Sequence, residues 1–283
     1  MCLNQTLQDL YIKACDLELQ AFKPGNVSIY SEAHDMTVND FMVSARVSAP
    51  FICNEQLELG EKIYLAIQAT REAVGCNTNL GIVLLCAPLI QAFQQRKHDQ
   101  SLRTSLHTVL TQTTQTDCDW VYKAIRIASP GGLGNADQQD VMSAPHVTLT
   151  EAMAIASEKD LIARQYVTDF TEIFDFTILE YNGKNELNPD LAHIVVLLYA
   201  EFLKKYSDSH VQRKFGHVYD AVIAKKMSLL SLQLQESHFT DHMQDLIDLD
   251  EWFKTNKINP GTTADMMVAT FVTVFLEQLI PNG

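Results

Sequence analysis

Seven of the eleven glycines in this 283-residue sequence fall in or beside four short loops that are also rich in Pro, Asn and Thr. The loops are Lys23-Pro24-Gly25-Asn26, Asn77-Thr78-Asn79-Leu80-Gly81, residues 129–137 and residues 259–265. Glycine lets backbone approach a ligand closely, and a loop that leads into a helix presents free N–H groups to an anion. A single loop of this kind is more often an ordinary helix cap, but four of them favour a shared ligand site.

Cationic side chains accompany these loops. Lys23 lies in the first loop, Arg71 stands one turn before Gly75, Arg126 precedes the third loop and Arg164 follows Lys159-Asp160. Each alone is more often a solvated surface residue, but their repeated nearness to the loops favours a phosphate-bearing ligand. The predicted substrate- and phosphate-binding residues are Lys23, Gly25, Asn26, Arg71, Asn77, Thr78, Asn79, Arg126, Gly131, Gly132, Arg164, Asn259, Gly261 and Thr262.

Carboxylates near loop and helix boundaries complete the candidate site. Beside a phosphate, carboxylates usually hold Mg²⁺, because like charges repel, and the predicted Mg²⁺ ligands are Asp117, Asp137 and Asp265. A carboxylate or a histidine can instead serve as a general base toward a hydroxyl, and the predicted catalytic residues are His34, Asp35 and Asp140. For Asp117 and Asp265 the competing interpretation, a helix N-cap, is strong.

Composition excludes several classes of protein. The net charge of −14 repels polyanions and no basic stripe is visible, so nucleic-acid binding is not expected. The longest apolar run, residues 80–90, is too short to cross a bilayer, and no basic segment precedes an apolar stretch at the N-terminus. The six cysteines lack zinc-ligand spacing and are interpreted as reduced, mostly buried thiols. A cytoplasmic protein is expected.

Apolar residues recur at helical spacing along nearly the whole chain. Helices are predicted over 3–21, 37–50, 58–74, 80–93, twice within 101–128, from 148, and over 158–174, 190–206, 217–235, 241–254 and 264–280. Pro88 predicts a kink or break, Thr116 or Asp117 is expected to cap a helix, and Phe174 begins the best strand candidate, residues 174–179. We predict one all-α domain over residues 1–283, a multi-helix bundle with a loop-built site and the apolar helix 264–280 in its middle.

Four motifs give the sequence a family resemblance. They are Lys23-Pro24-Gly25-Asn26-Val27, His34-Asp35-Met36, Gly75-x-Asn77-Thr78-Asn79-Leu80-Gly81 and Asn259-Pro260-Gly261-Thr262-Thr263-Ala264-Asp265. In order and spacing they resemble the triphosphoribosyl-dephospho-CoA synthase family, and the likeness runs along most of the chain. The resemblance implies an all-α fold and a transfer in which the 2′-hydroxyl of dephospho-CoA attacks the ribose C1 of ATP, adenine leaves and the triphosphate stays attached. Such a transfer implies a base, Mg²⁺ and cationic groups for the triphosphate.

The second motif departs from the family pattern. Well-characterised members carry Asn-Thr-His-Lys-Gly where this chain has Asn77-Thr78-Asn79-Leu80-Gly81. In this the sequence is similar to a divergent branch of archaea and methylotrophic bacteria, whose genes often accompany those of the tetrahydromethanopterin pathway. Two alternatives therefore stand beside triphosphoribosyl transfer: an enzyme of one-carbon cofactor synthesis with a different phosphorylated substrate, and a non-catalytic helical binding protein. A homodimer is expected only on the base rate for enzymes.

Overall fold

The computed structural model describes residues 2–32, 36–130, 140–185 and 190–281. Within these ranges the fold is entirely helical, and the sole β feature is an isolated bridge between Ser28 and Ser31, so the predicted all-α class is confirmed. The helices are α1 (Leu3–Gln20), α2 (Val38–Ile52), α3 (Leu59–Val74), α4 (Leu80–Gln95), α5 (Leu102–Thr111), α6 (Gln115–Ala128), α7 (Leu149–Ala156), α8 (Leu161–Val167), η1 (Ile173–Thr177), α9 (Ile178–Asn185), α10 (Leu191–Lys205), α11 (Ser209–Phe215), α12 (Asp220–Glu236), η2 (Phe239–His242), α13 (Met243–Thr255) and α14 (Gly261–Gln278).

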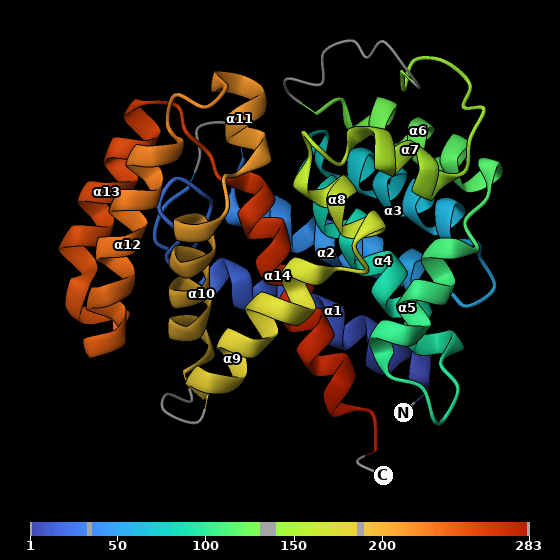
Figure 1. Ribbon diagram of the computed structural model, residues 1–283, viewed down its shortest axis with the longest axis horizontal. Helices are drawn as coiled ribbons and strands as arrows, with labels where there is room; N and C mark the ends of the chain where they lie inside the picture. Colours follow the sequence, from blue (N-terminus) through green and yellow to red (C-terminus); the bar gives the residue numbers. More distant parts are fainter. Residues whose placement is uncertain (1, 33–35, 131–139, 186–189, 282–283) are drawn as a thin grey trace.

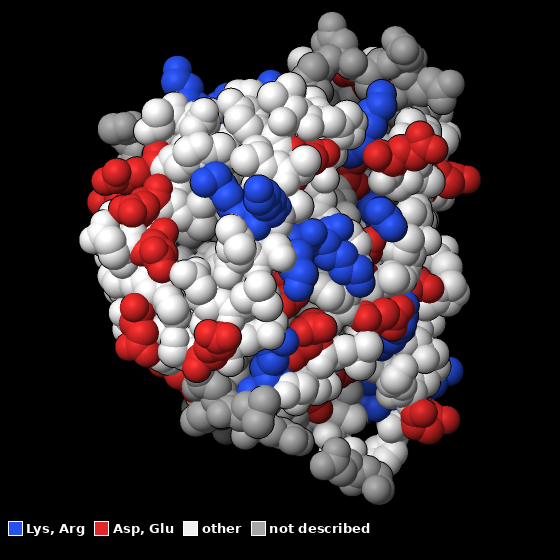
Figure 2. Space-filling view, turned by 60° about the vertical axis from the view of Figure 1, so that its left-hand side comes forward, with Lys and Arg blue, Asp and Glu red and all other residues white. Residues whose placement is uncertain are grey.

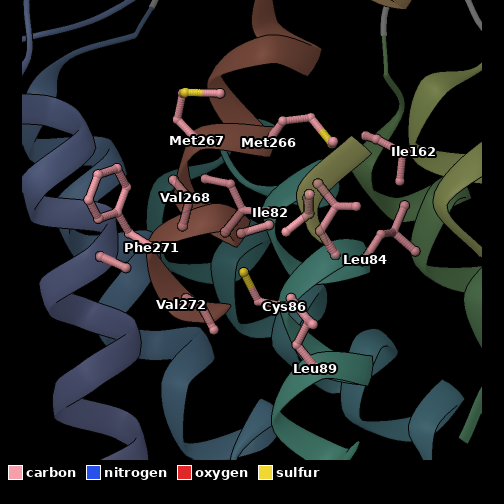
Figure 3. Close-up of a cluster of buried hydrophobic side chains, with 14 of the residues drawn as sticks. Ile82, Leu84, Cys86, Leu89, Ile162, Met266, Met267, Val268, Phe271 and Val272 are labelled. Carbon is pink, nitrogen blue, oxygen red and sulfur yellow. The ribbon is translucent and has the colours of Figure 1, made fainter. Parts of the chain in front are cut away.

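Helix α14 runs through the middle of the molecule, as predicted for residues 264–280 (Figure 1). It packs against α1, α4, α10 and α11, so nearly all of its side chains are buried. Figure 3 shows the contact with α4, where Met266 and Val268 lie near Ile82 and Cys86. The helix begins three residues before the predicted start, at Gly261, which brings the fourth loop directly to its N-terminus.

Polar caps begin several helices at the predicted places. The Thr148 hydroxyl accepts a hydrogen bond from the Glu151 amide, and the Glu151 carboxylate accepts one from the Thr148 amide, which completes the predicted capping box. Helix α6 differs from prediction, because its N-cap is Thr114 rather than Thr116 or Asp117. Asp117 is the third residue of the helix and accepts hydrogen bonds from the Thr114 amide at 2.8 Å and the Gly60 amide at 2.9 Å.

Of the kink or break predicted at Pro88, the break is not found, since α4 is continuous from Leu80 to Gln95. Proline has no N–H, so the carbonyl four residues earlier loses its helical partner. That carbonyl belongs to Leu84, and it accepts a hydrogen bond of 2.6 Å from the buried Tyr166 hydroxyl. A side chain from α8 therefore replaces the missing backbone donor.

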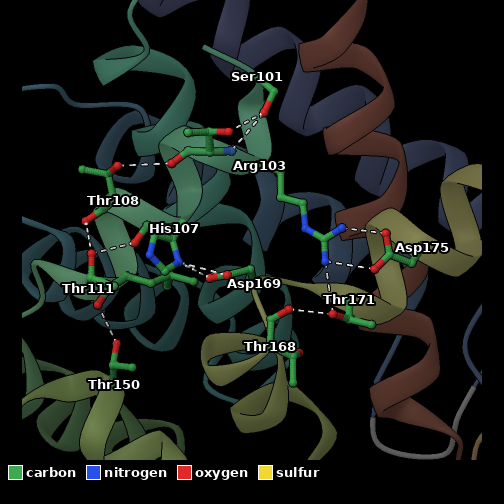
Figure 4. Close-up of polar contacts among 12 residues, drawn as sticks. Ser101, Arg103, His107, Thr108, Thr111, Thr150, Thr168, Asp169, Thr171 and Asp175 are labelled. Carbon is green, nitrogen blue, oxygen red and sulfur yellow. Dashed lines mark hydrogen bonds and ion pairs between the residues drawn. The ribbon is translucent and has the colours of Figure 1, made fainter.

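The predicted helix over 158–174 ends early, and residues 174–179, the best strand candidate in the sequence, are helical. Helix α8 stops at Val167 because Asp169 and Phe170 adopt positive φ angles of 50° and 57°. The chain then forms the π-helical turn η1 and continues into α9. Figure 4 shows how this region is attached to α5, with Arg103 contacting Asp175 at 2.6 Å and His107 contacting Asp169 at 2.9 Å. These tertiary contacts hold a backbone path that local propensity does not reveal.

The close approach of α3 to α6 yields a stability prediction. A Cβ added at Gly60 would lie 2.5 Å from the Asp117 Cα and 2.6 Å from its carbonyl oxygen. Because both neighbours are backbone atoms, the two helices must separate, and Gly60→Ala is expected to lower the free energy of unfolding by about 1–3 kcal/mol. Urea-induced unfolding measures the loss.

Gly183→Ala in α9 is the matched control for this variant. A Cβ there meets no atom of the described residues within 4 Å. Alanine has the higher helix propensity, by up to about 1 kcal/mol, so this variant is expected to be at least as stable as the parent protein. Equal stability of the two variants would contradict the close α3–α6 contact.

Candidate functional site

A cavity of about 280 Å³ lies where α4, α8, α11 and α14 begin. Described residues from each of the four predicted loops line it, although those loops are far apart in the sequence. The loop residues at the cavity are Asn26, Asn77, Thr78, Asn79, Leu80, Gly81, Pro130, Asn259, Gly261, Thr262, Ala264 and Asp265. The fold thus brings the four loops together around one space.

Two of the helices present unbonded amides at this cavity. In α4 the Leu80 amide is capped by the Asn77 side-chain oxygen at 3.2 Å, whereas the amides of Gly81 and Ile82 have no acceptor among the described residues. In the first turn of α14 the Thr262 amide is likewise without an acceptor in the described part of the chain. The N-terminus of a helix carries a partial positive charge of roughly half a unit, so these amides can receive an anion.

Asp265 is the carboxylate that faces this cavity from α14. It is half-buried, and no described residue forms a hydrogen bond or an ion pair with it. Burial raises the pKa of Asp265 well above its ordinary value, and the negative charges of Glu18 and Asp208 raise it further. A carboxylate held without a protein partner is available to a ligand or to a proton.

Gly81 makes room for this carboxylate. A Cβ at position 81 would lie 2.0 Å from Oδ2 and 2.6 Å from Cγ of Asp265, and 2.8 Å from Cδ1 of Ile162. The second predicted loop therefore needs glycine at this position so that the Asp265 side chain can lie against the start of α4.

Amide and hydroxyl side chains connect the loops to one another. The Asn26 side-chain NH₂ donates to the Asn259 side-chain oxygen at 2.8 Å, which joins the first loop to the fourth. The Thr78 and Ser44 hydroxyls are 2.5 Å apart, and the Asn79 NH₂ donates to the Ser48 hydroxyl at 3.3 Å. The side-chain oxygen of Asn79 is buried and has no hydrogen-bond partner among the described residues, so it is free for a donor in the cavity.

Four further polar residues line the cavity and were not predicted: Glu18, Asp160, His210 and Arg213. Arg213 is the one Lys or Arg side chain among the described lining residues, and it pairs with the Asp160 carboxylate, which also caps α8. His210 is partly buried, and burial lowers its pKa from the ordinary value. No glycine lies within residues 208–213, so glycine-rich loops do not indicate this segment. The sequence feature that could have indicated it is Asp208, the N-cap residue of α11.

Lys23 lies away from the cavity, in contrast to its predicted role as a phosphate ligand. Its ammonium group is fully buried and donates to the carbonyls of Glu18, Ala21 and Val27 at 2.7, 3.3 and 3.0 Å. It also forms an ion pair of 3.0 Å with the Glu18 carboxylate. These acceptors use all of its hydrogens, so Lys23 stabilises the turn after α1.

Other predicted site residues also hold the structure together instead of lining the cavity. Gly25, with a φ of 85°, donates its amide to Asp250 at 2.7 Å. Arg126 donates to the Val141 carbonyl, and Arg164 pairs with Glu172 at 3.0 Å. Arg71 is exposed in the last turn of α3. None of these four is in contact with the cavity in the described structure.

The predicted catalytic and metal residues divide into two groups. His34, Asp35 and Asp137 lie outside the described residues, as do Gly131 and Gly132, which were predicted to bind phosphate. Of the described residues, Asp140 accepts a hydrogen bond from the Met142 amide at 2.8 Å and does not line the cavity. Asp117 is a capping residue whose two oxygens both accept hydrogen bonds, and it does not line the cavity. Only Asp265 lies at the cavity.

A resident metal site is not evident in the described ranges. They contain no cluster of three or more His, Cys, Asp or Glu residues that could hold a metal ion. Mg²⁺ often takes only one or two protein carboxylates and completes its shell with substrate phosphates and water. Asp265, unpaired and beside the amides of α4 and α14, fits that kind of site.

Figure 2 shows how charged side chains are distributed over one face of the molecule. Several basic side chains gather near the centre of this face, and acidic side chains lie around them. None of the helices in the described ranges is both long and apolar enough to cross a membrane.

Comparison with known proteins identifies a family over nearly the whole chain. The model of the family described as ATP:dephospho-CoA triphosphoribosyl transferase matches residues 4–282. A solved structure from Archaeoglobus fulgidus, described as a "putative triphosphoribosyl-dephospho-coA synthase", is 23% identical, with a TM-score of 0.58. The match covers 82% of this chain and 96% of that chain, and at this identity it shows the shared fold. No curated protein matches.

The raised pKa of Asp265 predicts how stability depends on pH. The folded protein keeps a proton that the unfolded chain releases above about pH 3.8, so the free energy of unfolding falls as the pH rises from there toward the raised pKa. The slope is at most about 1.4 kcal/mol per pH unit. Asp265→Asn lacks this titration and is expected to be more stable than the parent protein at pH 7, by a margin that shrinks toward pH 4.

Asp40→Asn is the matched control and should show the opposite trend. Hydrogen bonds from Thr37 lower the pKa of Asp40, so its contribution to stability is present at neutral pH and is lost as the pH falls through that lowered pKa. Urea unfolding at several pH values measures both variants. Parallel profiles for Asp265→Asn and the parent protein would show that Asp265 is not held in an unfavourable environment.

Proposed function

We propose, because the chain belongs to the ATP:dephospho-CoA triphosphoribosyl transferase family, that it transfers the triphosphoribosyl group of ATP to a hydroxyl of a cofactor precursor such as dephospho-CoA. The observation that carries the proposal is the cavity at the start of α4 and α14. There, amides and a carboxylate without partners among the described residues lie beside one another. We further propose that residues 1–283 form one domain. One cluster of buried apolar residues in the described structure includes residues of both α1 and α14, which supports this.

The amides of Gly81, Ile82 and Thr262 are proposed to bind phosphate oxygens of the substrate. Backbone N–H groups at a helix N-terminus form short hydrogen bonds to anions and need no charged side chain. Asn26, Asn77, Asn79 and Asn259 add neutral donors and acceptors around the same space. This set compensates for the loss of Lys23, whose ammonium group is committed to carbonyls.

Asp265 is proposed to contribute an oxygen ligand to Mg²⁺ that accompanies the triphosphate. The bound ion would neutralise phosphate charge as the ribosyl centre becomes cationic. The raised pKa of Asp265 falls when a cation lies beside it, because the ionised form is then favoured. Binding of Mg-ATP would therefore release a proton.

His210 is proposed as the base for the acceptor hydroxyl. Its lowered pKa keeps the imidazole neutral at pH 7, and no described residue forms a hydrogen bond with the ring. The acceptor oxygen forms a bond to the ribose C1 and gives its proton to the imidazole. The bond from C1 to adenine breaks, and its electron pair leaves with adenine. A positioned general base typically contributes about 10²–10⁴-fold to the rate.

The acceptor can also be a different phosphorylated compound, such as an intermediate of tetrahydromethanopterin-type cofactor synthesis. Two observations favour this second candidate. Asn79 and Leu80 line the cavity where well-characterised family members have His and Lys, and the described wall holds no Lys or Arg other than Arg213, which is paired with Asp160. A site with few cations suits an acceptor with fewer phosphates than dephospho-CoA.

Adenine release tests the proposed transfer. The full chain with Mg-ATP and dephospho-CoA is expected to release adenine, which chromatography quantifies. His210→Gln is expected to lower kcat by about 10²–10⁴-fold. His107→Gln is the control, because that histidine is exposed and pairs with Asp169 away from the cavity. ATP binding without adenine release would exclude dephospho-CoA as acceptor and leave the second candidate, and absence of ATP binding would overturn the proposal.

The pH dependence of ATP binding tests the role of Asp265. Below the pKa of this group the affinity for Mg-ATP is expected to rise by up to about tenfold per pH unit, because a proton must leave when the cation binds. Calorimetric titration of the parent protein and Asp265→Asn at pH 6, 7 and 8 measures the difference, since the titration of ATP itself is common to both. An identical pH dependence of the two proteins would contradict the proposed role.

A further inference from the structure

Helix α12 carries an exposed apolar face opposite its buried face. Ile223, Met227, Leu230 and Leu234 are buried on the side that packs against α10. On the opposite side Leu229 is 58% exposed and Leu232 is 57% exposed. In Figure 1 the helix lies on the left of the molecule, between α10 and α13.

The exposed residues form a narrow stripe along the helix. We define the outer stripe as Ala221, Lys225, Leu229, Leu232 and Glu236, all of which are exposed. Steps of four, four, three and four residues keep side chains on one face of a helix with 3.6 residues per turn. This is the spacing by which one helix packs along another.

Polar residues beside the stripe are bound within the chain. Lys226 lies over the Trp252 ring at 4.6 Å, Gln233 donates to Asp245 at 2.9 Å, and Gln235 donates to Glu201 at 2.8 Å. In contrast, Lys225 and Glu236 of the outer stripe have no ion pair or hydrogen-bonded side-chain partner among the described residues. Within the outer stripe, the two charged side chains and the two exposed leucines are therefore available to contact another molecule.

The order of these four groups is self-complementary. Leu229 and Leu232 lie at equal distances from the point between Leu230 and Ser231, and so do Lys225 and Glu236. When two copies of α12 pack antiparallel about a two-fold axis at this midpoint, each Leu229 meets a Leu232. In the same arrangement, each Lys225 lies opposite a Glu236 of the other copy, which has the opposite charge.

We propose that the outer stripe of α12 is the interface through which two copies of this chain form a two-fold symmetric dimer. Every contact occurs twice in such an interface, so the pairing contains one leucine pair on each side of the axis and two ion pairs at its rim. The apolar centre with a charged rim is the usual arrangement of protein–protein interfaces. None of the stripe residues lines the cavity, so the proposal is independent of the function proposed above.

Sedimentation equilibrium of the full chain between about 1 and 100 µM tests the dimer, in the range where small interfaces dissociate. The expected result is a reversible equilibrium between the mass of one chain and twice that mass. Leu229→Glu is expected to raise the dimer dissociation constant at least about 100-fold, because it places charges in the apolar centre. A parent protein that remains monomeric at 100 µM would overturn the proposal.

Charge exchange tests the antiparallel register. Lys225→Glu alone and Glu236→Lys alone each place like charges opposite one another twice, so each is expected to raise the dissociation constant by about tenfold or more. The double variant Lys225→Glu/Glu236→Lys restores opposite charges and is expected to return to within about threefold of the parent value. Failure of the double variant to recover would overturn this register.

Leu179→Glu serves as the matched control. Leu179 is 62% exposed on α9, outside the outer stripe, and its replacement is expected to leave the dissociation constant unchanged. Far-ultraviolet circular dichroism checks that each variant remains folded, which is expected because all the replaced side chains are exposed. Loss of the dimer in the Leu179→Glu protein would place the interface elsewhere and contradict the proposal.

Discussion

The side-by-side packing of α4 and α14 is the constraint on which the candidate site depends. Both helices begin at the cavity, so the partial positive charges of their N-termini act on the same space. Their contact is apolar along most of its length, with Ile82, Cys86, Met266 and Val268 in the core. The N-termini of α4 and α14 are therefore held beside the cavity by a large buried surface.

Burial acts on two charged groups near this end with opposite results. Lys23 loses water but gains three carbonyls and the Glu18 carboxylate, and removal of either charged partner would cost about 3–5 kcal/mol. Asp265 also loses water but gains no hydrogen bond from the described residues, so its pKa rises. Lys23 is thus bound to partners inside the fold, whereas Asp265 is left without a partner among the described residues, at the expense of stability. Such an expense is typical of a functional site.

Tertiary contacts also decide the shape of the cavity wall. Tyr166 donates the hydrogen bond to the Leu84 carbonyl that Pro88 cannot donate, and α4 continues past the proline. The same residue anchors α8, whose first turn brings Ile162 and Ala163 to the cavity. The proline and the tyrosine are far apart in the sequence, and their pairing follows only from the packing of α8 on α4.

The sequence by itself determined the helical class, most helix positions and the four loops that carry polar groups. It could do so because apolar periodicity and caps such as Thr148 with Glu151 act within a few residues. Only the tertiary structure decided which partners each polar group has and whether it lines the cavity. Lys23 and Asp117 are satisfied by neighbours that folding brings to them. Asp265 has no partner in the described part of the chain, and His210 comes from a segment without glycine. The physical reason is that the free energy of a buried charge depends on which partners surround it, and those partners come from distant parts of the chain.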